Sequence, residues 1–178
     1  MQQSLTNEQA AYLAGVIDGE GHLAIVRGVT ASGGGPRFAF VMKITNTNEE
    51  WLKGLQTWVG GKVYNQLSTA KRLNNRPCFD LRWIGAEAKS ILLHIRPYIQ
   101  LKARHCDVLT RYFEVAAARR LANLPGRKAN PVLVAELNNL HTEIKSLNLR
   151  GLYQTWKQGG PKQGHVCQIV ACGRPHFS

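Results

Sequence analysis

The sequence predicts an α+β fold in which helices alternate with β-hairpins. Capping residues precede several amphipathic runs, which is typical of helices. Between them lie segments that alternate apolar and polar residues, which is typical of half-buried strands. Glycine-rich or polar turns join these segments in pairs. The 178 residues are 44% hydrophobic, enough for one domain with its own core.

The first unit is a helix followed by a hairpin, expected over residues 8–18, 22–29 and 37–45. Thr6 or Asn7 can cap the helix. The segment TASGGGP is the predicted turn. In the second strand one side is apolar throughout, so the hairpin has one buried face, formed by Phe38, Phe40, Met42 and Ile44.

The second unit repeats this order. Asn48 can cap a helix that runs to about Val59, and Gly60-Gly61 ends it. A second hairpin and three helices follow, expected over residues 62–68, 76–84, 86–95, 97–122 and 131–148. The predicted order is therefore α-ββ-α-ββ-α-α-α.

Charge is the strongest bulk signal. Lys and Arg number 23 against 11 Asp and Glu, which gives a net charge of +12. Such a field attracts polyanions, with nucleic acid the leading partner. No apolar run is long enough to cross a membrane, the first residues do not resemble a signal peptide, and four scattered cysteines form no disulfide scaffold. We expect an intracellular protein that is not secreted, with no membrane partner.

The outward faces of both hairpins carry long side chains that can donate hydrogen bonds. A twisted β-ribbon fits the DNA major groove, where Arg and Lys pair with guanine and Gln with adenine. A plain solvated sheet face is the alternative. The predicted contacts to double-stranded DNA are Arg37, Lys43, Lys62, Tyr64, Gln66, Arg76, Asp80 and Arg82, with His22 facing DNA or solvent.

The stretch LAGVIDGEG, residues 13–21, is costly for a helix. Two glycines four residues apart weaken it, and carboxylates lie at the unfavourable end of its dipole. The stretch resembles the signature of the LAGLIDADG homing endonucleases, with Val16, Gly19 and Glu20 as departures. The resemblance continues in ITNTNEEWLKGLQTWVGGKVY, IRPYIQLK and LNLRG, and covers about residues 8–151.

The resemblance implies an αββαββα fold with an antiparallel β-saddle and helices on its opposite face. In that family the signature helices of two subunits or half-domains pack together, which implies a dimer contact through Leu13, Gly15, Val16 and Gly19. Each helix delivers one acidic residue, here Glu20, to a divalent metal site. The Gly19 carbonyl is a further ligand by resemblance. The implied cofactor is Mg²⁺ or Mn²⁺, with no small-molecule cofactor.

Two further catalytic positions follow from the resemblance. Lys102 matches a lysine that reaches the hydrolytic water or the scissile phosphate, where positive charge stabilises the transition state. Asn46 matches a residue that positions the water. Asp18, by contrast, is expected to be structural and to form hydrogen bonds near the helix end.

The signature occurs once, and a double-strand break needs two active sites. The resemblance therefore implies a homodimer that cuts a long pseudopalindromic site and leaves short 3′ overhangs, as in intron homing. The alternative is a catalytically silent relative that binds nucleic acid, such as an RNA maturase or a transcription regulator. Glu20 and Lys102 are both present, which favours cutting.

We expect an endonuclease domain over residues 1–151 and a basic tail over residues 152–178. The tail carries His165, Cys167, Cys172 and His176, whose spacing matches no standard zinc pattern. The host compartment is either a prokaryotic cytoplasm or an organelle.

Overall fold

The computed structural model describes residues 5–29, 35–66, 77–122 and 130–149. The predicted order of elements is confirmed: α1 (Asn7–Glu20), β1 (Gly21–Val29), β2 (Pro36–Asn46), α2 (Glu49–Val59), β3 (Lys62–Asn65), β4 (Phe79–Ile84), α3 (Ala86–Ile95), the short 3₁₀ helix η2 (Arg96–Tyr98), α4 (Ala103–Ala122) and α5 (Pro131–Leu147). These elements belong to one compact unit within Met1–Asn148. The predicted tail and Arg76 lie outside the described residues.

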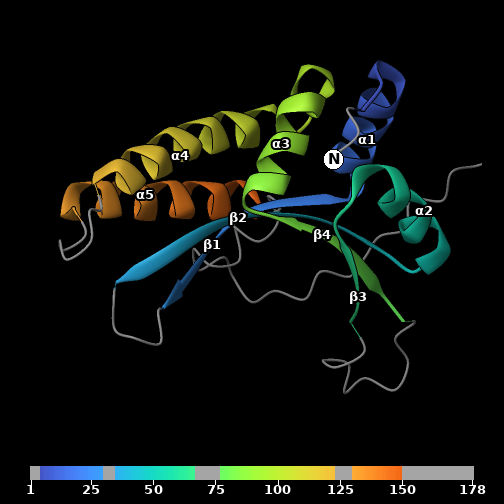
Figure 1. Cartoon of the computed structure of the whole chain (residues 1–178), viewed down its shortest axis with the longest axis horizontal. Helices are drawn as coiled ribbons and strands as arrows, with labels where there is room; N and C mark the ends of the chain where they lie inside the picture. Colours follow the sequence, from blue (N-terminus) through green and yellow to red (C-terminus); the bar gives the residue numbers. More distant parts are fainter. Residues whose placement is uncertain (1–4, 30–34, 67–76, 123–129, 150–178) are drawn as a thin grey trace, which may run out of the picture. The chain divides into compact units, whose positions relative to one another are not determined.

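The four strands form one open antiparallel sheet in the order β1-β2-β4-β3. In Figure 1 the helices α3, α4 and α5 lie above the strands, on one side of the sheet. The α+β class predicted from the alternation of strands and helices is therefore confirmed.

One face of the sheet forms the core against the helices. Its fully buried side chains come from three strands and include Leu23, Phe40, Met42, Leu81 and Trp83. Burying each such side chain contributes about 1.5–3 kcal/mol to folding, so together they hold the sheet against the helical layer. The indole N–H of Trp83 is satisfied by the Val59 carbonyl at 3.0 Å, which fixes the end of α2 over β4.

Two helix boundaries differ from the prediction. Helix α1 continues to Glu20 instead of ending at residue 18. Helix α4 begins at Ala103 and not at Pro97, which lies in η2. The physical reason for the second difference is a set of hydrogen bonds from the turn before α4 to a carboxylate on α1. None of the helices in the described parts of the chain is both long and apolar enough to cross a membrane.

Candidate nucleic-acid interface and catalytic site

The junction between α1 and β1 places an acidic side chain at the edge of the sheet. Thr6 caps the start of α1 in a capping box with Gln9. At the other end Gly21 is extended, so the chain passes directly from helix into strand. A Cβ on Gly21 would lie 2.6 Å from the Ile17 carbonyl oxygen, so only glycine fits this turn. Glu20 is consequently the last helical residue, and its side chain is exposed.

Asn46 lies beside Glu20 because the β1–β2 register pairs Gly21 with Ile44, near the end of β2. The Asn46 amide nitrogen donates to Glu20 Oε2 at 2.9 Å. Its amide oxygen accepts the backbone N–H of Asn48 at 2.9 Å, which fixes the orientation of the amide. Two predicted catalytic residues, 26 positions apart in the chain, are thus in direct contact.

Asp18 holds the turn that precedes α4. Its carboxylate accepts the backbone N–H groups of Gln100, Leu101 and Lys102 at 2.7, 3.1 and 3.0 Å. The Lys102 ammonium donates in return to the Asp18 carbonyl oxygen at 2.5 Å. The expected structural role of Asp18 is confirmed. The same contacts bring Lys102 to the end of α1 that carries Glu20.

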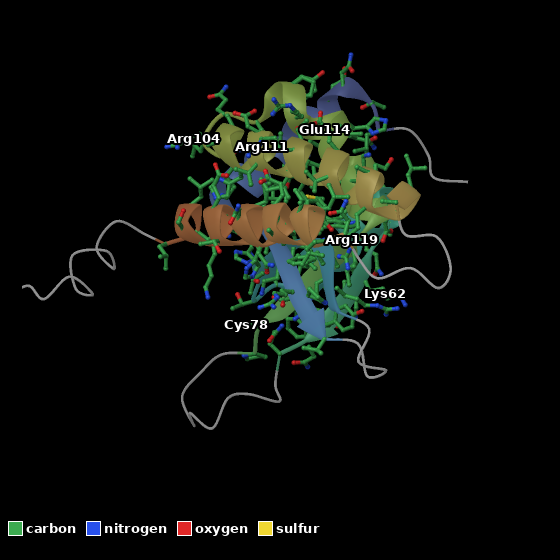
Figure 2. All side chains as sticks on the ribbon, turned by 90° about the vertical axis from the view of Figure 1, so that its left-hand side faces the viewer. Lys62, Cys78, Arg104, Arg111, Glu114 and Arg119 are labelled. Carbon is green, nitrogen blue, oxygen red and sulfur yellow. The ribbon has the colours of Figure 1, made fainter. Side chains whose placement is uncertain are left out.

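The face of the sheet opposite the core carries a row of basic side chains. The strand registers align His22 with Lys43, Lys43 with Arg82 and Arg82 with Lys62, so that each of the four strands contributes one. We call these four residues the cationic row, whose positive charges come from Lys43, Arg82 and Lys62. Partial burial lowers the pKa of His22, and Lys43 lowers it further, so the imidazole is mostly neutral at neutral pH. Lys62 is labelled in Figure 2, where it lies at the level of the strands.

A buried carboxylate organises the cationic row. Asp80 accepts hydrogen bonds from Lys43 Nζ at 3.2 Å and from Arg82 Nη2 at 2.6 Å. Gln66 Nε2 donates to this same oxygen, Oδ2, whereas Thr45 Oγ1 donates to Oδ1 at 2.6 Å. Burial raises the pKa of Asp80, but these hydrogen bonds outweigh it, so the pKa lies below its ordinary value.

Asp80 corrects one expectation. It lies on the predicted side of β4, but its exposed fraction is 0% because its hydrogen-bonding partners cover it. It therefore does not present itself to a ligand and instead orients Lys43, Arg82 and Gln66. Thr45 was missed by the sequence reasoning. Only the strand register, which places Thr45 opposite Asp80, identifies it.

Two other predicted contacts lie on the same face. Tyr64 is 41% exposed, and the Arg82 guanidinium lies 5.0 Å from the centre of its ring. Arg37 is exposed near the tip of the first hairpin, opposite Gly28. Tyr64 and Gln66 adjoin the cationic row through Arg82 and Asp80, whereas Arg37 lies farther along β2 on the same face. In Figure 2 Arg104, Arg111 and Glu114 lie apart from the strands, along α4.

The outer side of α1 is lined by small residues. Ala11, Gly15 and Gly19 are exposed and recur every fourth position, so they share one helix face. A Cβ added to Gly15 or Gly19 would meet no atom of the described residues within 4 Å, apart from the nearby backbone of its own helix. Shallow grooves flank the stripe, one beside Trp51 and the other beside Leu101. Nothing within the described residues therefore requires glycine at these two positions.

Known structures share the fold of this chain. I-CvuI in complex with its target superposes with a TM-score of 0.61 at 18% identity, over 82% of this chain and 85% of that chain. The archaeal intron-encoded homing endonuclease I-Vdi141I, complexed with DNA, gives 0.63 at 16%, over 86% and 99%. The LAGLIDADG homing endonuclease I-SmaMI, bound to cleaved DNA, gives 0.57 at 17%, over 99% and 53%. No protein-family model and no curated protein matches the sequence.

The chain has the LAGLIDADG homing-endonuclease fold. Its αββαββ order, its open sheet and the position of the signature stretch on α1 agree with the resemblance in the sequence. The chain spans almost the whole of I-Vdi141I but about half of I-SmaMI. Within this fold, the LAGLIDADG helix is α1, and its last residue is Glu20.

One residue expected at the contact of LAGLIDADG helices is placed differently. Leu13 has an exposed fraction of 0% and packs in the core of its own chain. It points inward because it lies on the face of α1 that also carries Ala10, Ala14 and Ile17. Tyr12, which precedes Leu13 and lies beside the small-residue stripe, is instead 50% exposed.

A histidine that sequence reasoning missed adjoins this site. His105 lies in the first turn of α4, three residues after Lys102, and its Nδ1 atom is buried with no hydrogen-bond partner among the described residues. Burial lowers its pKa, a hydrogen bond with Asn148 opposes this, and Lys102 lowers it further. Asn148 also donates to the Leu23 carbonyl at 2.9 Å and so ties the end of α5 to β1.

Proposed function

We propose that this chain is one subunit of a metal-dependent, site-specific DNA endonuclease that acts as a homodimer. Glu20, Asn46 and Lys102, from three separate segments, meet at the end of α1, and this observation carries the proposal. The site lies where β1 begins, two residues before the cationic row. A reactive end and a basic surface suited to DNA therefore adjoin each other where β1 begins.

The donor atoms fit a hard divalent cation such as Mg²⁺ or Mn²⁺, which prefers oxygen ligands. Glu20 offers an exposed carboxylate, and Gly19 offers a carbonyl in the last helical turn, where carbonyls lack intrahelical partners. Among the described residues of one chain, no three His, Cys, Asp or Glu converge on a common point. A second copy would add a second carboxylate and complete the set. Crystals of I-CvuI with DNA were obtained with calcium or magnesium.

The side chains around Glu20 have distinct roles in this proposal. A divalent metal held by Glu20 and the Gly19 carbonyl would supply an activated water and offset charge on the leaving oxygen. Asn46 orients the water through its amide, which Asn48 holds in place. Lys102 contributes positive charge where the phosphate accumulates negative charge in the transition state. Asp18 positions Lys102 and takes no part in bond breaking.

The proposed dimer places two copies of α1 against each other through Gly15 and Gly19. The open space where a Cβ of either glycine would lie supports this, because no described residue outside the backbone of α1 fills it. That the chain spans about half of I-SmaMI also supports it, since two copies would match the longer enzyme. Such a dimer reads a long pseudopalindromic site, as the two-fold axis requires, and cuts each strand once to leave short 3′ overhangs.

A cleavage selection tests this function. The full chain is given a randomised duplex library with and without Mg²⁺, beside Glu20→Gln. The matched control is Glu114→Gln, an exposed carboxylate on α4. We expect Mg²⁺-dependent breaks at one pseudopalindrome with the wild type and the control, and binding without breaks for Glu20→Gln. Enrichment by binding with no breaks from the wild type would instead indicate a catalytically silent DNA- or RNA-binding relative.

A further inference from the structure

The outward face of the sheet carries apolar side chains next to the cationic row. The registers align Ala24 with Val41 and Val41 with Ile84, and they align Val26 with Ala39. Ile84 is 52% exposed and Val26 is 48% exposed. We call these five residues the apolar block. Isolated apolar residues are common on protein surfaces, but a contiguous group on three paired strands is a feature of recognition sites.

The order of the two surfaces along the strands is set by the register. Starting from Glu20, β1 presents His22 in the cationic row, then Ala24 and Val26 in the apolar block. Residues on one face of a strand are about 7 Å apart, since each residue advances about 3.4 Å. That distance corresponds to about two base-pair steps of duplex DNA. The block therefore lies farther from the reactive end than the row does.

We propose that the apolar block packs against thymine methyl groups in the major groove of the DNA target. The inference rests on the proposed function and specifies part of its substrate. The C5-methyl of thymine is the apolar group that base edges present in that groove, whereas Arg and Lys pair with guanine. Each half-site then carries T·A pairs about two base pairs farther from the cut than the bases that meet Lys43 and Arg82.

DNA is the occupant favoured by charge. The block is continuous with Lys43 and Arg82 on the same face, and the chain carries a net charge of +12. A protein partner would have to cover these cations as well as the apolar side chains. Duplex DNA satisfies both at once, because its phosphates and guanine edges meet the cations while its methyl groups meet the block.

Removing single methyl groups from the DNA tests the proposal. The best half-site from a binding selection is resynthesised with deoxyuridine in place of each thymine in turn. We expect about a fourfold loss of affinity at one or two positions, the change for one buried methyl of about 0.8 kcal/mol. At those positions 5-methylcytosine should bind more tightly than cytosine. In Ile84→Ala or Val26→Ala the loss caused by deoxyuridine should shrink at one of these positions.

The control is Leu93→Ala, which shortens a side chain of similar exposure, 53%, on α3. It should leave every deoxyuridine effect unchanged. Tight binding with no deoxyuridine effect at any position would overturn the inference and leave the proposed function intact. A wild-type effect that persists fully in both Ile84→Ala and Val26→Ala would also overturn it. Failure to bind any duplex selectively would overturn the proposed function itself.

Discussion

Asp18 and Lys102 hold each other through reciprocal hydrogen bonds across 84 positions of sequence. The carboxylate of Asp18 accepts the Lys102 backbone N–H, and the Lys102 ammonium donates to the Asp18 carbonyl. One residue of the LAGLIDADG helix thus positions the lysine, while Glu20, two residues later, presents the acid. The end of α1 therefore determines the positions of both proposed catalytic charges, the Glu20 carboxylate and the Lys102 ammonium.

The first prediction concerns Asp18→Ala. The variant loses the acceptor of three backbone N–H groups, which should lower the free energy of unfolding by about 1–2 kcal/mol, since water replaces part of what is lost. Because Lys102 is then less well placed, single-turnover cleavage should fall more than DNA affinity. Asp107→Ala removes an exposed carboxylate that forms an ion pair with Arg96, and it should leave stability, cleavage and DNA affinity unchanged. Equal losses of binding and cleavage would contradict a positioning role.

The second prediction concerns Asp80→Asn. The variant removes a buried charge that Lys43 and Arg82 share, which should destabilise the protein at neutral pH by about 1–3 kcal/mol. Base selection from a randomised half-site should also broaden, since three DNA-facing side chains lose their common anchor. Retained stability together with an unchanged base preference would show that the anchor is dispensable.

The pH dependence of stability gives a third prediction. The pKa of Asp80 in the folded chain lies below its ordinary value of 3.8. Its contribution is therefore complete above that value and is lost as the pH falls through the folded pKa. The free energy of unfolding of the wild type, measured with denaturant, should fall more steeply below about pH 4 than that of Asp80→Asn. Parallel acid limbs for the two proteins would be inconsistent with this assignment.

The fourth prediction concerns Gly15→Leu. Space is open around this position within one chain, and leucine favours helix over glycine by about 1 kcal/mol, so each subunit should remain folded. The proposed contact between two α1 helices should be blocked, and light scattering should report a monomer. Ala135→Leu introduces the same side chain at an exposed site on α5 and should leave the dimer intact. A dimeric Gly15→Leu variant would rule out this contact.

The fifth prediction concerns Lys43→Ala. If Lys43 meets a phosphate, the variant should bind DNA more weakly, and the slope of log K against log salt should decrease by about 1. Lys53→Ala is the matched control, because Lys53 lies on α2 and pairs with Glu49 at 2.8 Å. An unaltered salt slope for Lys43→Ala would place this lysine away from the phosphates.

Much of this architecture was predictable from local patterns. Capping residues, glycine pairs and strict alternation in β2 predict the order of elements, because each reflects contacts within a few residues. The signature stretch also indicated Glu20, with the neighbouring Gly19, as candidate metal ligands. The boundaries of α1 and α4 were predicted less well. Both depend on where Asp18 and Gly21 meet other parts of the chain, and local propensity does not contain that information.

The sequence by itself determined the α+β class, the basic surface, the acidic helix end and the small-residue stripe of α1. Only the tertiary structure decided which of these residues contact one another. Strand register aligned His22, Lys43, Arg82 and Lys62 into one row and placed Asp80 beneath it. A shift of one residue in any pairing would turn those side chains to the other face, and packing of the whole sheet against the helices selects the register.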